Sequence, residues 1–102
     1  MKSKAKKSEE IDVELIQRKI DLIERGLPVD ITESELASLE TTFRGARSFY
    51  IDMIKALYDR RATGEDVEHH IIEESKNLAG VELALRKIDE FRKIHSEHIK
   101  TK

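Results

Sequence analysis

The segment between residues 68 and 74 holds the side chains best suited to chemistry. His69 and Glu73 are four residues apart, as are His70 and Glu74, so each pair would lie one turn apart on a helix. Such a pair can bind one edge of a metal ion, but a carboxylate-bridged di-metal bundle needs Glu-x-x-His on two helices with further inward glutamates. The sequence lacks that larger pattern. We therefore interpret the pairs as intrahelical contacts and expect no metal and no other cofactor.

Other signs of catalysis are absent from the sequence. It has no glycine-rich phosphate loop, no nucleophile elbow and no zinc-peptidase motif. It has no cysteine, which excludes disulfides, thiolate metal sites and thiol nucleophiles. We expect that the protein is not an enzyme, and a small helical-bundle enzyme or metal carrier is the least favoured alternative.

Length and composition favour one helical domain. The chain has 102 residues, of which 39% are charged and 38% hydrophobic. This balance is typical of helices with one solvent-exposed face and one buried face. Its formal charge of −2 rules out a polycation that coats nucleic acid over its whole surface. No apolar run approaches the ~18 residues of a membrane span, and no signal-peptide core follows the basic N-terminus. We expect a cytoplasmic protein that does not enter membranes.

The central element predicted from the sequence is a helix over residues 33–62. Thr32 and Glu35 have the spacing of a capping box, in which each side chain bonds the backbone N–H of the other. Apolar residues then recur in alternating steps of three and four, which is the seam of a helix packed lengthwise on another helix. The seam residues are Leu36, Leu39, Phe43, Ala46, Tyr50, Met53 and Leu57.

Two more helices are predicted on either side of this one. The first covers about residues 9–25 and ends at Gly26, because glycine adopts the left-handed conformation of a helix terminus. The third covers about residues 65–99 and follows a tight reversal at Gly64. It either continues straight through Gly80 or kinks there. The second and third helices therefore form a long antiparallel hairpin.

These elements predict an all-α fold in which the shorter N-terminal helix buttresses the hairpin. Residues 8–102 form the single helical domain, and residues 1–7 are expected to be a disordered basic tail. At 1.5 Å per residue, a helix of about 17 residues reaches roughly half the length of the hairpin. The turn end of the hairpin would stay uncovered, and we expect a second copy to complete a helical bundle by dimerisation.

The uncovered end carries the predicted partner-binding surface. Exposed apolar and aromatic patches of this kind mark protein interfaces. The sequence therefore predicts a protein–protein interaction or regulatory module, acting as a homodimer or through a different protein. The residues of this surface are Phe49, Tyr50, Met53, Ile54, Leu57, Tyr58, Val67, Ile71 and Ile72.

A nucleic-acid-binding regulatory protein is the alternative. Basic side chains cluster in the N-terminal tail and on the central helix, where they alternate with aromatic residues, a mixture found in nucleic-acid grooves and in protein hot spots. Asp52 and Asp59 interrupt the cluster, which weakens it as a phosphate-binding stripe. The residues of this alternative site are Lys2, Lys4, Lys6, Lys7, Arg44, Arg47, Arg60 and Arg61.

Overall fold

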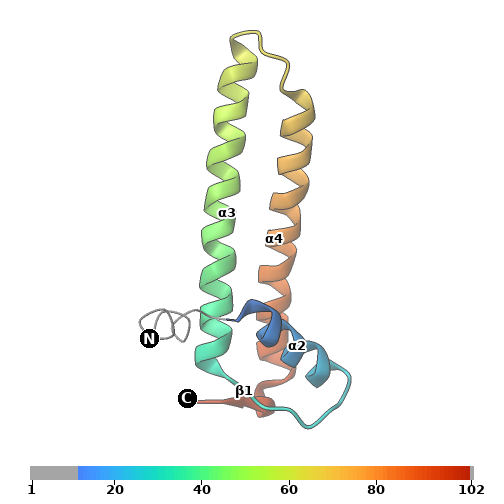
Figure 1. Cartoon of the computed structure of the whole chain (residues 1–102). Helices are drawn as coiled ribbons and strands as arrows, with labels where there is room; N and C mark the ends of the chain where they lie inside the picture. The colour runs from blue at the N-terminus through green and yellow to red at the C-terminus, as the bar shows by residue number, and fades with distance from the viewer. Residues whose placement is uncertain (1–11, 102) are drawn as a thin grey trace, which may run out of the picture. The chain divides into compact units, whose positions relative to one another are not determined.

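The computed structural model describes residues 12–101, and this part of the chain is mostly helical (Figure 1). The expected all-α class is confirmed, and residues 12–101 contain three α-helices, of which the second and third pack closely. The elements are helices α2 (Val13–Glu24), α3 (Glu33–Ala62) and α4 (Glu68–Ile94), a 3-10 turn η1 (Ser96–His98), and two-residue strands β1 (Ile31–Thr32) and β2 (Ile99–Lys100).

The helix bounds agree with the sequence for α3 and differ for the others. α3 covers the expected residues, α2 ends one residue early, at Glu24, and α4 begins three residues late, at Glu68. The expected start of the first helix at residue 9 and the basic tail of residues 1–7 lie outside the described residues. Asp12 is the N-cap of α2, because its carboxylate accepts a hydrogen bond of 3.0 Å from the Leu15 amide.

The C-terminal end of α4 corrects the prediction of a helix to residue 99. α4 ends at Ile94, and after η1 the chain turns extended, so that Ile99 pairs with Ile31 and Lys100 with Thr32 in a parallel ladder. His98 adds a hydrogen bond between its Nδ1 and the Val29 carbonyl, at 3.2 Å. The pairing joins segments almost seventy residues apart, so a local apolar period could not reveal it.

Glycine closes two of the helices in the same way. Gly26 and Gly64 have φ values of +90° and +99°, in the left-handed region that costs glycine little. At each end two backbone bonds form a Schellman motif: Gly26 and Leu27 donate to Ile23 and Leu22, and Gly64 and Glu65 donate to Arg61 and Arg60. The expected helix ends at both glycines are confirmed.

Gly80 lies within α4, which continues through it without a break in its helical assignment. A Cβ added at Gly80 would meet open space, so this glycine does not mark a close approach of two backbones. The same holds for Gly45 on α3.

The chain divides into two compact units. The terminal unit contains residues 1–40 and 88–102, and the hairpin unit contains residues 41–87. α3 and α4 contribute residues to both units.

The terminal unit has the larger core among the described residues. α2 supplies two of its side chains, and the others come from β1, the first turns of α3 and the last turns of α4, so α2 packs among these ends as a buttress. The buried residues are Ile16, Ile23, Ile31, Leu36, Leu39, Ile88 and Phe91.

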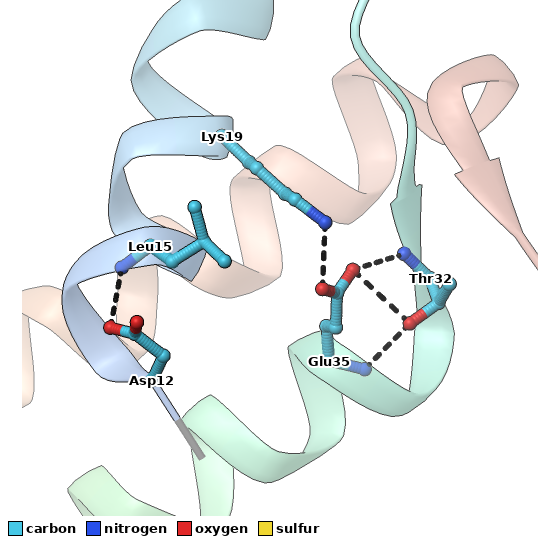
Figure 2. Close-up of polar contacts among 5 residues, drawn as sticks. All are labelled: Asp12, Leu15, Lys19, Thr32 and Glu35. Carbon is cyan, nitrogen blue, oxygen red and sulfur yellow. Dashed lines mark hydrogen bonds and ion pairs between the residues drawn. The ribbon is translucent and has the colours of Figure 1, made fainter. Parts of the chain in front are cut away.

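The start of α3 is fixed by the capping box, which the structure confirms (Figure 2). The Glu35 amide donates to Thr32 Oγ1 at 3.0 Å, and the Thr32 amide donates to Glu35 Oε1 at 2.9 Å. The other carboxylate oxygen of Glu35 accepts a hydrogen bond of 2.7 Å from Lys19 Nζ on α2. Burial alone would raise the pKa of Glu35, but the bonds from Lys19 and Thr32 outweigh it and lower that pKa below its ordinary value.

A second ionic contact joins α4 to the same end of α3. Arg92 donates from Nη2 to Glu33 at 2.8 Å and from Nη1 to Glu40 at 3.1 Å. Burial would lower the pKa of Arg92, but hydrogen bonds to Glu40 and Glu33 raise it, so the guanidinium stays charged. The first two turns of α3 are thus bound by cations from both neighbouring helices.

The terminal core predicts a contrast between two neighbours on α4. Phe91 is 1% exposed and Ile94 is 68% exposed. Phe91→Ala should lower the free energy of unfolding by about 3–5 kcal/mol, because it leaves a cavity in the core. Ile94→Ala should stay within about 0.5 kcal/mol of the wild type. Urea denaturation of the three proteins measures the difference, and equal losses would contradict the described core.

The pKa shift of Glu35 predicts an acid-dependent contribution to stability. Since its pKa is lower in the folded chain, the contribution is complete above the ordinary pKa of 4.5 and disappears as pH falls through the folded-state pKa. Glu35→Gln keeps a capping acceptor but loses the ionic bond, so at neutral pH it should cost about 1 kcal/mol. The gap between this variant and the wild type should narrow as the pH falls below 4.5, in melts recorded across pH. Glu90→Gln, on an exposed position of α4, is the control and should follow the wild type.

Candidate protein interface

The hairpin unit uses part of the predicted partner surface for its own core. Leu57, Val67 and Ile71 are 6%, 3% and 4% exposed, and Met53 packs against them. The expectation that these residues are open to a partner needs correction, because α3 and α4 bury them against each other beside the turn. Their apolar type could not distinguish the inner seam of the hairpin from its outer faces.

The rest of the predicted surface is open to solvent. Phe49, Tyr58 and Ile72 are 56%, 49% and 51% exposed, while Tyr50 and Ile54 are half-buried. Exposed apolar side chains mark an interaction surface where they lie next to one another, so their grouping on the hairpin has to be examined. These residues remain the candidate site.

Sequence reasoning missed Leu83, an exposed leucine of the hairpin unit at 46%. It lies eleven residues after Ile72, and eleven residues complete about three helical turns, so both side chains lie on one face of α4. This spacing was present in the sequence, but the neighbouring seam residues masked it.

The exposed aromatic residues of α3 do not share a face. Phe49 and Tyr58 are nine residues apart, which places them about 180° from each other around the helix. Phe49 contacts Tyr50 edge to face, with ring centroids 5.5 Å apart. The hairpin therefore offers two separate apolar flanks rather than one broad patch.

The side of α3 that carries Tyr58 is connected to α4 by charged side chains. The Arg61 guanidinium lies 5.8 Å from the centroid of the Tyr58 ring, and it pairs with Glu68 at 3.2 Å. Glu68 precedes Ile72 by one turn of α4. Tyr58 and Ile72 thus belong to one side of the hairpin, which is also crossed by the Arg47–Glu82 pair at 3.5 Å.

The arginines of the alternative nucleic-acid site are engaged within the chain. Arg47 and Arg61 pair with carboxylates of α4, and Arg60 pairs with Glu65 at 2.8 Å, which raises the pKa of Arg60. Arg44 also has an interaction partner within the chain. The lysines of the basic tail lie outside the described residues. A phosphate-binding stripe would have to compete with these acidic partners.

The histidine segment on α4 shows only pairwise contacts. His69 Nε2 lies 3.8 Å from Glu73 Oε1, and the rings of His69 and His70 meet edge to face at 5.5 Å. Within residues 12–101, no three histidine or acidic side chains are arranged to hold a metal ion.

A hollow of about 240 Å³ lies in the terminal unit, between α2 and the start of α3. Thr32 and Glu35 in its wall already bond each other and Lys19 (Figure 2). One carboxylate oxygen of Asp12 accepts from the Leu15 amide, so several polar groups of the wall are already bonded within the chain. Its lining residues are Asp12, Leu15, Ile16, Thr32, Ser34, Glu35 and Ser38.

Comparison with known proteins gives no family assignment: no protein-family model, no curated protein and no solved structure matches the chain. None of the helices in the described part is both long enough and apolar enough to cross a membrane. The candidate site therefore depends on the geometry of the hairpin unit.

Two adjacent residues of α3 test the division between core and surface. Leu57→Ala should lower the free energy of unfolding by about 2–5 kcal/mol, because its side chain fills the hairpin core. Tyr58→Ala removes an exposed ring and should change the stability of the monomer by about 0.5 kcal/mol or less. Chemical denaturation of a dilute sample measures both, and a larger loss at Tyr58 would contradict this assignment.

Proposed function

We propose that the protein is an interaction module that binds another protein chain through the exposed apolar side chains of its hairpin unit. The observation that carries the proposal is the exposure of Tyr58, Ile72 and Leu83, since about half of the surface of each residue is accessible to solvent. Binding would remove these side chains from water, and apolar burial contributes about 25 cal/mol per Å².

The small core of the hairpin unit supports this proposal. Three hydrophobic side chains are fully buried in the hairpin unit, against seven in the described part of the terminal unit. A two-helix hairpin has one seam, so its outer faces depend on a further surface for cover. A regulatory role in the cytoplasm suits such a module, and its cysteine-free composition is compatible with that location.

Nucleic-acid binding is the weaker candidate. Three arginines of that alternative site, Arg47, Arg60 and Arg61, have acidic partners within the chain. The hairpin unit also has as many acidic as basic side chains. A small helical-bundle enzyme or metal carrier is the least favoured candidate, and in the described residues no three histidine or acidic side chains are grouped to hold a metal ion.

The test compares two double variants of the full chain. Tyr58→Ser with Ile72→Ser removes apolar surface from the hairpin unit, and Leu27→Ser with Ile94→Ser removes exposed apolar surface from the terminal unit. Sedimentation measures self-association, and chemical crosslinking in an extract of the native cells captures other proteins. The hairpin variant should lose the association that the wild type shows, while the control variant should keep it.

The same proteins are then titrated with single-stranded and duplex oligonucleotides at several salt concentrations. The proposal predicts no binding that falls steeply with salt, because phosphate contacts release counterions and give that dependence. Protein association that survives in the hairpin variant, or its absence in every protein, would contradict the proposed function. Salt-sensitive oligonucleotide binding in the same samples would favour the alternative.

A further inference from the structure

The two halves of the hairpin unit carry opposite net charges. Its half nearest the turn, residues 52–75, carries seven acidic and three basic side chains, a formal charge of −4. The other half, residues 41–51 and 76–87, carries one acidic and five basic side chains, a formal charge of +4. The Arg47–Glu82 and Arg61–Glu68 pairs show that this division cuts both helices at the same level.

The outward face of α4 carries an apolar stripe across the boundary between these halves. Ile72 lies on the acidic side and Leu83 on the basic side, and Ala79 lies between them on the same face. Ile72 and Leu83 are 51% and 46% exposed, so the stripe is open in the single chain. Its midpoint falls between residues 77 and 78, close to the level at which the charge changes sign.

We propose that a second copy of this chain covers the stripe, with the two α4 helices antiparallel about a two-fold axis at its midpoint. The inference rests on the proposed function and names its partner. A two-fold axis there places Ile72 of each copy against Leu83 of the other, which is the self-complementary arrangement of an isologous dimer. The same rotation places the acidic half of each hairpin beside the basic half of the other.

Charge decides the direction of the pairing. In a parallel pair the two acidic halves would lie side by side, as would the two basic halves, and like charges in register repel. In the antiparallel pair each half meets its opposite. Glu68, which pairs with Arg61 of its own chain at 3.2 Å, then lies at the level of Arg86 of the second copy, on the same side of the apolar stripe. Its carboxylate has two oxygens and can accept from both guanidinium groups.

The neighbouring side chains extend this contact onto α3. Tyr58 lies on the same side of the hairpin as Ile72, as the chain of contacts through Arg61 and Glu68 shows. Phe49 lies on the opposite flank of α3 and takes no part. The contact spans about three turns of each α4 and is small for a stable interface, so the dimer should dissociate on dilution.

Single cysteines test the direction and register, since the chain has no cysteine of its own. An equimolar mixture of Ile72→Cys and Leu83→Cys chains should form an interchain disulfide under mild oxidation. Either variant alone should stay uncrosslinked, because equal positions in the antiparallel pair are about 16 Å apart along the helix. A disulfide needs Cβ atoms about 4 Å apart. Ile72→Cys crosslinking to itself would overturn the antiparallel pairing in favour of the parallel one.

Charge exchange and light scattering test the same contact without oxidation. The wild type should show a mass that rises from monomer to dimer with concentration, and Glu68→Arg or Arg86→Glu should each weaken the dimer about tenfold. The double exchange Glu68→Arg with Arg86→Glu should recover most of that loss, because it restores opposite charges across the axis. Ile72→Glu should abolish the dimer, while Phe49→Glu, a substitution at a comparably exposed position on the other flank, should leave it unchanged.

The outcomes separate this inference from the proposed function. A wild type that stays monomeric up to millimolar concentration overturns the second copy as partner. Crosslinking of the hairpin to a different protein in the extract would still support the proposed function in that case. A dimer that survives Ile72→Glu but is lost in Phe49→Glu also overturns it. Thermal melts followed by circular dichroism verify that each variant is folded before its mass is interpreted.

Discussion

The terminal unit depends on the carboxylate of Glu35. One of its oxygens completes the reciprocal cap with Thr32, and the other accepts the ammonium of Lys19 from α2. A single side chain therefore sets where α3 begins and holds the neighbouring helix against it. The positive end of the α3 dipole favours a negative charge at this place, which adds to the effect of the two bonds.

Arg92 performs the matching task for α4. Its guanidinium bridges Glu33 and Glu40, which are separated by about two turns of α3, so the fork of donors fixes both the distance and the rotation between the helices. The parallel ladder of β1 with β2 then binds the chain beyond α4 to the segment that precedes α3. Around these polar contacts lie seven of the ten buried hydrophobic side chains of the described residues, although Leu15, Leu27 and Ile94 of the same unit stay exposed.

The hairpin unit has a smaller core than the terminal unit. Its described core is one small cluster beside the turn, formed by Leu57, Val67 and Ile71, and its outer faces keep large apolar side chains in water. Its opposed charges make it attractive to a copy of itself in one direction and repulsive in the other. The proposed function follows from these exposed side chains beside a small core, and the proposed partner follows from the opposed charges.

The sequence by itself determined the features that arise from neighbouring residues. The spacing of Thr32 and Glu35 located the start of α3, and Gly26 and Gly64 located two helix ends, because caps and left-handed glycines act within one turn of backbone. Only the tertiary structure decided which apolar residues are core and which are surface. Leu57 and Tyr58 are adjacent in the chain, but the facing helix covers the first and leaves the second exposed. The end of α4 was decided in the same way, because β2 pairs with a distant strand whose hydrogen bonds replace those of another helical turn.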